Sequence, residues 1–289
     1  SNRILRELNE VEMTSSNFSS SRGIQTAVKD FINKSIHDIY NEGAELPLLH
    51  SSTTQVLQAG DGEYAFPSDM RTVDFESFFL KPTELITNGE FTSNITSWTN
   101  ATTGAVGGGT PAYNSGGNGR LRLNDAAVSQ AISTVKNKTY KVQVRVIDSS
   151  SGGSSLAIKV GNAAHATTDL SATLTVTNYG EGKVLDTTFS ASQVATYITV
   201  INSDSNNLDV DYVRVSRSDI APRKLASITY DTYLQTNKVA DDVNLSSSYG
   251  IPTKIVRKPD YGSFIISPKP NTGEYTVSYD YFTTHTDLS

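Results

Sequence analysis

Short segments of alternating apolar and polar residues recur through the middle of the chain, with turn-forming residues between them. The clearest of these segments are residues 139–147, 155–160, 172–176, 197–201 and 210–215. Alternation with a period of two is the pattern of a strand with one buried face, and each segment is short for a helix. Regularly spaced short strands separated by Gly, Ser, Thr and Asn are typical of a β-sandwich or jelly roll. The middle of the chain is therefore predicted to form two packed sheets.

The residues before this block contain one clear helix. Between Ile24 and Tyr40 the apolar residues recur at helical spacing, and Gly43 stands just past the end, where glycine commonly terminates a helix. We expect the apolar face of this helix to pack against another part of the protein. A shorter helix over residues 4–11 and strands over residues 53–57 and 71–80 are also predicted.

The residues after the block again predict strands. Alternation over residues 225–234 predicts one strand, and the segments 253–256, 263–267 and 274–282 predict a three-strand antiparallel meander. The aromatic residues of the last strand fall on one face, which suits either a packed sheet face or a surface between subunits. The residues predicted for such an oligomer interface are Tyr275, Tyr279 and Tyr281.

Together these patterns predict an α+β fold of two domains. Residues 1–82 and 217–289 would form one body from the N-terminal helix and the antiparallel meander, and residues 83–216 an inserted all-β jelly-roll or sandwich domain. Without the insert, the strand that ends at Leu80 and the strand that begins near Leu225 would form a β-hairpin. Such an insert costs its host little, since loop-closure entropy grows only logarithmically with length.

Composition excludes several classes of function. The chain has no cysteine, so disulfides, thiolate zinc sites and cysteine nucleophiles are ruled out. The formal net charge is −6, from 24 Lys and Arg against 30 Asp and Glu, which does not favour specific binding of nucleic acid. No segment approaches the ~20 apolar residues that span a bilayer, so no membrane contact is predicted.

No set of residues predicts catalysis, and we expect the chain not to be an enzyme. The four histidines are far apart in the sequence and share no spacing typical of metal ligands: His37, His50, His165 and His285. Asp209 and Asp211 lie on one face of a predicted strand, but we expect no acid–base work from this pair. The sequence therefore shows no credible pair of carboxylates for the function of a glycoside hydrolase.

Three aromatic residues of the central block are candidates for contact with sugars. Tyr113 and Tyr179 stand in loop-like sequence, where a ring can stack on a sugar or simply close the loop. Trp98, the only tryptophan, follows the first strand of the block and is predicted to belong to the core. The predicted glycan contacts are therefore Tyr113 and Tyr179.

The outer segments resemble the adaptor proteins of short-tailed phages, the head-to-tail component called tail tubular protein A. The resemblance rests on the order of several stretches, which are residues 27–42, 53–54, 63–69, 73–80, 228–234 and 250–253, followed by the meander. It implies a homo-oligomeric ring of twelve subunits in the neck or tail of a virion, assembled in the host cytoplasm. The implied partners are the portal protein, the tail nozzle protein and tail fibres, with DNA passing through without specific binding.

The central block is similar to carbohydrate-binding-module-like jelly rolls. The similar stretches are residues 85–91 with Trp98, residues 138–142 and residues 208–215. Jelly rolls of this kind often hold a structural Ca²⁺ near their first and last strands through oxygen ligands. The resemblance implies such a site at Asp211, with Asn88 and Glu90 as further ligands, and otherwise no cofactor.

Two functions from different classes remain open. The first is a structural virion protein, a connector-ring subunit that links the portal to the tail nozzle and lets DNA pass. The alternative is a tail-fibre component or a receptor- or glycan-binding protein that acts through the inserted domain.

Overall fold

The computed structural model describes residues 14, 22–42, 49–102, 108–116, 119–149, 153–176, 182–238 and 249–284. Of these residues, 49% lie in strands and 11% in helices. The predicted α+β class, an adaptor-like body built from a helix and an antiparallel meander, is therefore wrong, because the protein is mostly β. Gly43, Tyr179 and the helix predicted over residues 4–11 lie outside the described residues.

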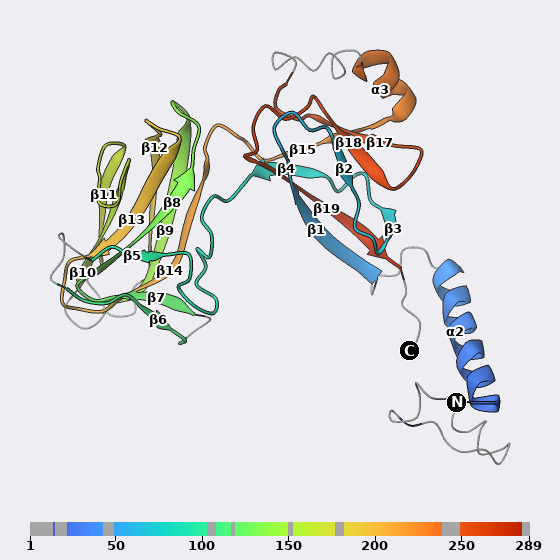
Figure 1. Cartoon of the computed structure of the whole chain (residues 1–289), viewed down its shortest axis with the longest axis horizontal. Helices are drawn as coiled ribbons and strands as arrows, with labels where there is room; N and C mark the ends of the chain where they lie inside the picture. Colours follow the sequence, from blue (N-terminus) through green and yellow to red (C-terminus); the bar gives the residue numbers. More distant parts are fainter. Residues whose placement is uncertain are drawn as a thin grey trace.

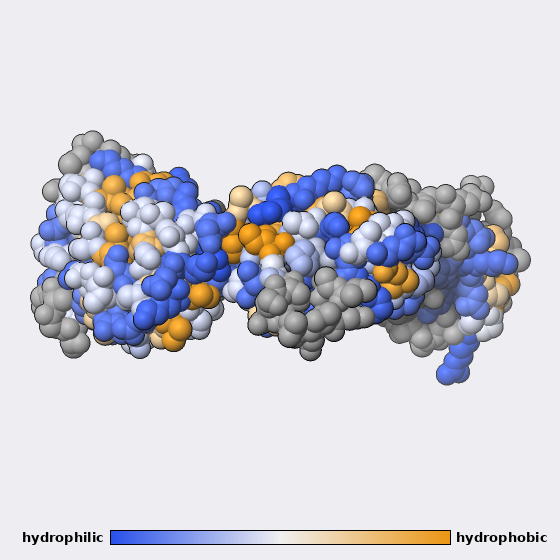
Figure 2. All heavy atoms as spheres, turned by 90° about the horizontal axis from the view of Figure 1, so that it is seen from above, coloured by the Kyte–Doolittle hydropathy of each residue, from blue (hydrophilic) through white to orange (hydrophobic). Residues whose placement is uncertain are grey.

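Figure 1 shows two β bodies, and in Figure 2 the molecule narrows between them. The first body is a sandwich of two five-stranded antiparallel sheets. In one, which we call the β13 sheet, the order is β11 (Leu170–Val176), β10 (Ser154–Gly161), β13 (Ala195–Asn202), β8 (Ala126–Ser133) and β5 (Thr99–Asn100). In the other, the β14 sheet, the order is β12 (Lys183–Ser190), β9 (Thr139–Ser149), β14 (Leu208–Arg217), β7 (Arg120–Leu123) and β6 (Ala112–Asn114).

Alternation along the strands builds the core of the sandwich. In β9, Tyr140, Val142 and Val144 are fully buried, whereas the polar residues between them point outward. Apolar residues of β8, β10, β13 and β14 join them in one continuous core. Each sheet has one apolar face, and the two faces exclude water only when they pack together. The predicted sandwich of the central block is confirmed.

The second body contains two further sheets (Figure 1). In the β19 sheet the order is β1 (His50–Val56), β19 (Tyr275–Thr283), β4 (Phe79–Pro82) and β15 (Arg223–Lys224), and β3 (Met70–Val73) also pairs with β19. In the β18 sheet the order is β16 (Ala226–Thr229), β17 (Lys254–Arg257), β18 (Ser263–Ser267) and β2 (Glu63–Ala65). The β16–β17 pair is parallel.

The predicted three-strand meander is wrong in its last strand. β17 and β18 pair as expected, but β19 leaves them and pairs with β1 and β4 in the other sheet. The alternating residues Tyr275, Tyr279 and Tyr281 do share one face of β19, and that face lies in the core of the second body. Each sheet of this body thus contributes one apolar face to a shared core.

The strand predicted over residues 225–234 is also wrong, since the segment divides into β16 and a short helix, α3 (Tyr230–Thr236). The side chain of Thr229 caps this helix by accepting a hydrogen bond from the backbone N–H of Thr232. Asp231 lies in the first turn, where the helix dipole favours negative charge. These local interactions favour a helical turn over continued alternation.

The helix predicted over residues 24–40 forms α2 (Ile24–Glu42) and stands apart from both β bodies in Figure 1. Phe31 is 69% exposed and Ile39 is 62% exposed. The packing that we expected for its apolar face is therefore not seen within the described part of the chain. No helix among the described residues is long and apolar enough to cross a bilayer.

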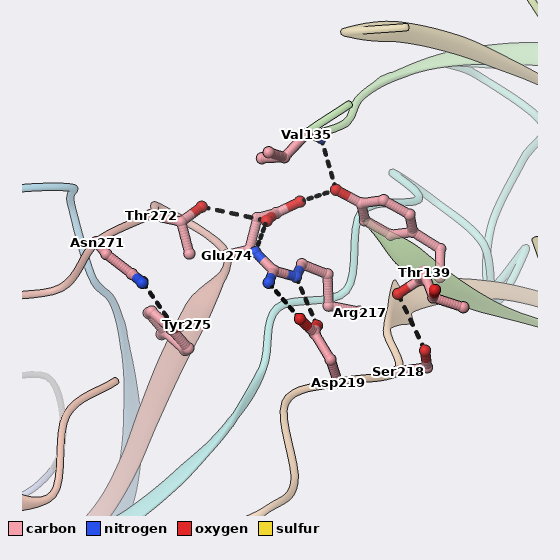
Figure 3. A network of polar contacts seen from close by, with 10 residues as sticks. Val135, Thr139, Arg217, Ser218, Asp219, Asn271, Thr272, Glu274 and Tyr275 are labelled. Atoms are coloured by element: carbon pink, nitrogen blue, oxygen red, sulfur yellow. Dashed lines mark hydrogen bonds and ion pairs between the residues drawn. The ribbon is translucent and has the colours of Figure 1, made fainter. Parts of the chain in front are cut away.

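The chain enters and leaves the sandwich through one junction, shown in Figure 3. The strand that leads into the sandwich, β4, pairs with the strand that leaves it, β15, and Leu80 lies opposite Arg223. This pairing is close to the hairpin predicted between the strands next to Leu80 and Leu225. That the sandwich folds without the rest of the chain stays a prediction.

A buried polar network closes this junction (Figure 3). Glu274, just before β19, accepts a hydrogen bond from the hydroxyl of Tyr140 at 2.5 Å and pairs with Arg217 at 2.7 Å. Arg217 also forms a two-pronged pair with Asp219, at 2.7 and 2.6 Å. Burial, and then the bond to Glu274, raises the pKa of Tyr140, so the hydroxyl remains a donor. Because the network includes residues of both bodies, it fixes one against the other.

Candidate functional site

The outer face of the β13 sheet is covered by the chain itself. The loop between β10 and β11 crosses this face, where the N–H of His165 donates to Thr199 Oγ1 at 3.0 Å and its ring contacts the carbonyl oxygen of Ala101. Thr199 and Ser129 face outward from the core, yet they are 0% and 4% exposed. Around β8 and β13 this side of the sandwich therefore offers little free strand surface to a ligand, whereas Ser171, Thr173 and Thr175 of the edge strand β11 are exposed.

The outer face of the β14 sheet is open by comparison. The outward residues of β9 are Lys141, Gln143 and Arg145, and each keeps part of its surface in solvent. Arg145 is flanked by Val184 of β12 on one side and by Tyr212 of β14 on the other. The result is a surface of long polar side chains around one aromatic ring.

A β-bulge in β14 places that ring on the open face. The register between β14 and β9 shifts between Val210, which pairs with Val146, and Tyr212, which pairs with Arg145. The extra residue, Asp211, shifts the alternation by one position, so Tyr212 points outward and Val213 is fully buried. Bulges recur near functional sites because they redirect a side chain in this way.

Ion pairs hold the side chains around Tyr212 in place. The guanidinium of Arg214 lies 4.3 Å from the centre of the Tyr212 ring, and its Nε lies 2.7 Å from Glu90 Oε1. The hydrogen bond to Glu90 raises the pKa of Arg214. Arg145 pairs with Asp211 at 3.2 Å. Long side chains restrained by such pairs lose less conformational freedom when a ligand binds.

A second group of polar atoms extends the face toward β12. Asp186 accepts hydrogen bonds from Lys141 Nζ and from Gln143 Nε2, both at 2.8 Å. The bond from Lys141, more than that from Gln143, lowers the pKa of Asp186, so the carboxylate is ionised at neutral pH. Charged donors and an ionised acceptor are thus available next to one another.

The two aspartates once considered as an acid–base pair are both held in ion pairs. Asp209 is 2% exposed and accepts bonds from Arg122 Nε at 2.8 Å, Arg122 Nη2 at 2.9 Å and Asn114 Nδ2 at 2.7 Å. Asp211 pairs with Arg145. Both carboxylates pair with neighbouring arginines.

Of the two predicted sugar contacts, only Tyr113 is among the described residues. Tyr113 is half-buried in β6, and its hydroxyl donates to the carbonyl oxygen of Thr92 at 3.1 Å, so it closes a loop. Tyr179 lies outside the described residues. Trp98 is 8% exposed, packs against Phe91 and donates from Nε1 to the carbonyl oxygen of Asn88, which confirms its place in the core.

The tyrosines predicted at an oligomer interface face inward instead. Tyr275, Tyr279 and Tyr281 are 1%, 2% and 7% exposed in the single chain. Tyr279 stacks on Phe78 with ring centres 4.5 Å apart, and burial raises the pKa of Tyr279 to about 12. Of the two roles considered for these rings, the structure supports the packed sheet face, because they have almost no surface left for a neighbouring subunit.

The three residues suggested for Ca²⁺ have protein partners in this structure. Asp211 and Glu90 pair with arginines, and Asn88 Nδ2 donates to the carbonyl oxygen of Thr96 at 2.9 Å. No three His, Cys, Asp or Glu side chains come together as a metal site in the part of the chain that the structure describes. The Ca²⁺ site stays a prediction.

Tyr212 was missed at the sequence level, although the sequence carries a signal for it. Along β14 the buried residues Val213 and Val215 are two positions apart, whereas Val210 and Val213 are three apart. An interval of three in a period-two pattern indicates a bulge. The polar pair inside that interval, Asp211 and Tyr212, marks where the strand changes face.

Comparison with known proteins finds solved structures that are similar to the sandwich. No family model matches the sequence. No curated protein matches it either. Matching solved structures include a family 4 carbohydrate-binding module, with 16% identity and a TM-score of 0.38 over 46% of this chain and 99% of that one. A family 61 module in complex with β-1,4-galactotriose matches at 15% identity and a TM-score of 0.37, over 47% of this chain and 99% of that one.

The C-terminal family 22 module of Clostridium thermocellum Xyn10B also matches, at 14% identity and a TM-score of 0.37, over 47% of this chain and 96% of that one. The sandwich is a jelly roll similar to carbohydrate-binding modules. At these identities and TM-scores the likeness concerns the fold and says nothing of what this chain binds. The comparisons give no support to a phage adaptor.

Proposed function

We propose that the protein binds a neutral glycan on the open face of the β14 sheet. The observation that carries the proposal is the bulge in β14, which turns Tyr212 outward into a set of ordered polar side chains. A sugar ring has a C–H face that packs on an aromatic ring and hydroxyls that both donate and accept hydrogen bonds. Gln143, Arg145 and Asp186 supply matching donors and acceptors around the tyrosine.

The charge balance of this face favours a neutral ligand. Four close pairs form among its charged side chains, which are Lys141 with Asp186, Arg145 with Asp211, Arg214 with Glu90 and Arg122 with Asp209. A fifth cation, Arg120, lies 4.0 Å from Asp209. Paired charges leave no strong field of one sign to attract an ionic ligand. They still offer charge-assisted hydrogen bonds to hydroxyl groups, and these are the stronger kind.

Affinity electrophoresis in gels that contain soluble xylan, galactan or mixed-linkage β-glucan tests the proposal. We expect at least one polysaccharide to retard the intact protein, and Tyr212→Ala to weaken that affinity by about tenfold, or about 1.4 kcal/mol. The matched control is Tyr197→Ala, because Tyr197 is a half-buried outward residue of the covered β13 sheet. Equal retardation of the two variants would place the binding site elsewhere.

The ring of subunits, the portal, nozzle and fibre contacts and the location in a virion stay predictions. They belong to the less favoured of the two functions, since the open face around Tyr212 supports glycan binding and the comparisons give no support to an adaptor. Light scattering of the purified chain tests the ring directly. A mass near twelve subunits is expected if the ring forms, and a monomeric mass at all concentrations would contradict it.

A further inference from the structure

The core of the second body opens to the surface at one side of the β19 sheet. A cavity of about 110 Å³ lies there, next to β3. The apolar residues that line it are Phe66, Met70, Val73 and Phe75. All four pack against the buried core and are nevertheless only half-buried. Apolar side chains left exposed in a concave surface are typical of a binding pocket.

The rim of this cavity is cationic. Arg71, Arg257 and Lys258 line it, and no carboxylate does. Lys258 already pairs with Glu63 and, at 3.0 Å, with Asp260, so its charge is compensated. Arg257 pairs with no carboxylate among the described residues and is exposed. The cavity therefore combines an apolar floor with a guanidinium that has no paired carboxylate among the described residues.

Two aromatic rings hold that guanidinium in position. Arg257 Cζ lies 5.3 Å from the ring centre of Phe75 and 5.1 Å from that of Tyr261. Tyr261 is 62% exposed and has a positive φ of 55°, a conformation that is uncommon for a bulky residue. Aromatic rings near a guanidinium do not accept its N–H groups as a carboxylate does, and the N–H edge matches the two oxygens of a carboxylate.

We propose that this cavity binds a carboxylate carried on an apolar stem, with the stem against Phe66 and Phe75 and the carboxylate on Arg257. The size suits a small group, since a cavity of about 150 Å³ holds a benzene molecule. Such a group is either a free organic acid or the end of a partner polypeptide. The site is separate from the glycan face, because it lies in the other β body.

Calorimetric titration of the whole chain with 3-phenylpropionate tests this proposal. We expect saturable binding of 3-phenylpropionate. The affinity should be about tenfold weaker for 3-phenylpropanol, which lacks the charge, and for inorganic phosphate, which lacks the apolar stem. Arg257→Gln is expected to weaken 3-phenylpropionate binding by a similar factor. The matched control Lys136→Gln, which removes an exposed cation of the sandwich, should bind like the natural chain.

Three results would overturn the proposal. These are no saturable binding of 3-phenylpropionate, equal affinity for the alcohol, and equal affinity of Arg257→Gln at an unchanged melting temperature. The peptide Gly-Gly-Phe, with a free or an amidated end, distinguishes the two sources. Tighter binding of the free peptide than of 3-phenylpropionate supports a partner polypeptide, and the reverse order supports a free acid.

Discussion

Replacing Glu274 by alanine is expected to lower the free energy of unfolding by about 3 kcal/mol, because its carboxylate serves several buried partners at once. One oxygen accepts from Tyr140, and the other pairs with Arg217 and accepts from Thr272 at 3.1 Å. Without it, the Tyr140 hydroxyl loses its acceptor and Arg217 keeps only Asp219. The junction between the two bodies should therefore loosen.

Urea unfolding of the intact protein measures this effect. The matched control is Glu76→Ala, because Glu76 pairs with Lys224 at 2.7 Å while its side chain is 72% exposed. A surface pair of this kind contributes less than about 1 kcal/mol. If the two variants lose the same stability, the junction network does not hold the bodies together.

Gly89→Ala is expected to destabilise the sandwich by about 3 kcal/mol, the upper range for overpacking a tight site. An added Cβ would lie 2.2 Å from the carbonyl oxygen of Val213 and 2.8 Å from Ile86 Cγ2. The strand cannot move away freely, because the N–H of Val213 donates to the carbonyl oxygen of Gly89 at 2.9 Å. The same displacement would disturb β14 next to Tyr212, so glycan affinity should fall too.

Thermal unfolding followed by circular dichroism tests this second prediction. Gly182→Ala is the matched control, since its added Cβ would meet only the carbonyl oxygen of Val146, at 3.9 Å. We expect Gly182→Ala to melt close to the natural chain and Gly89→Ala to melt well below it. Similar melting of both variants would show that the Gly89 contact relaxes easily.

Strands with one buried face could be predicted from the sequence. β18 begins and ends where alternation predicted it, at Ser263 and Ser267, and α2 begins at Ile24 as its helical spacing indicated. In each case the spacing of the apolar residues depends only on which face of the strand or helix is apolar. The strand with which each strand pairs could not be predicted in this way. The alternation of β19 does not indicate that β19 pairs with β1, in which His50 lies opposite Phe282.

Strands without alternation could not be predicted in the same way. In β8, Ala126, Ala127, Val128 and Ser129 are all buried, because one face meets the core and the other lies under the loop that carries His165. The site that we propose on the β14 sheet was not predicted for a related reason. Tyr113 and Tyr179 were chosen for their loop-like surroundings, whereas Tyr212 sits on a strand and faces outward only because the bulge shifts the alternation.

A crystal structure of the whole chain with an oligosaccharide of the polysaccharide that it binds tests the central claim most directly. We predict a sugar ring packed on Tyr212, with hydroxyls within hydrogen-bonding distance of Gln143, Arg145 or Asp186. A sugar bound to the covered face of the β13 sheet, to the loops of the sandwich or to the second body would contradict the account.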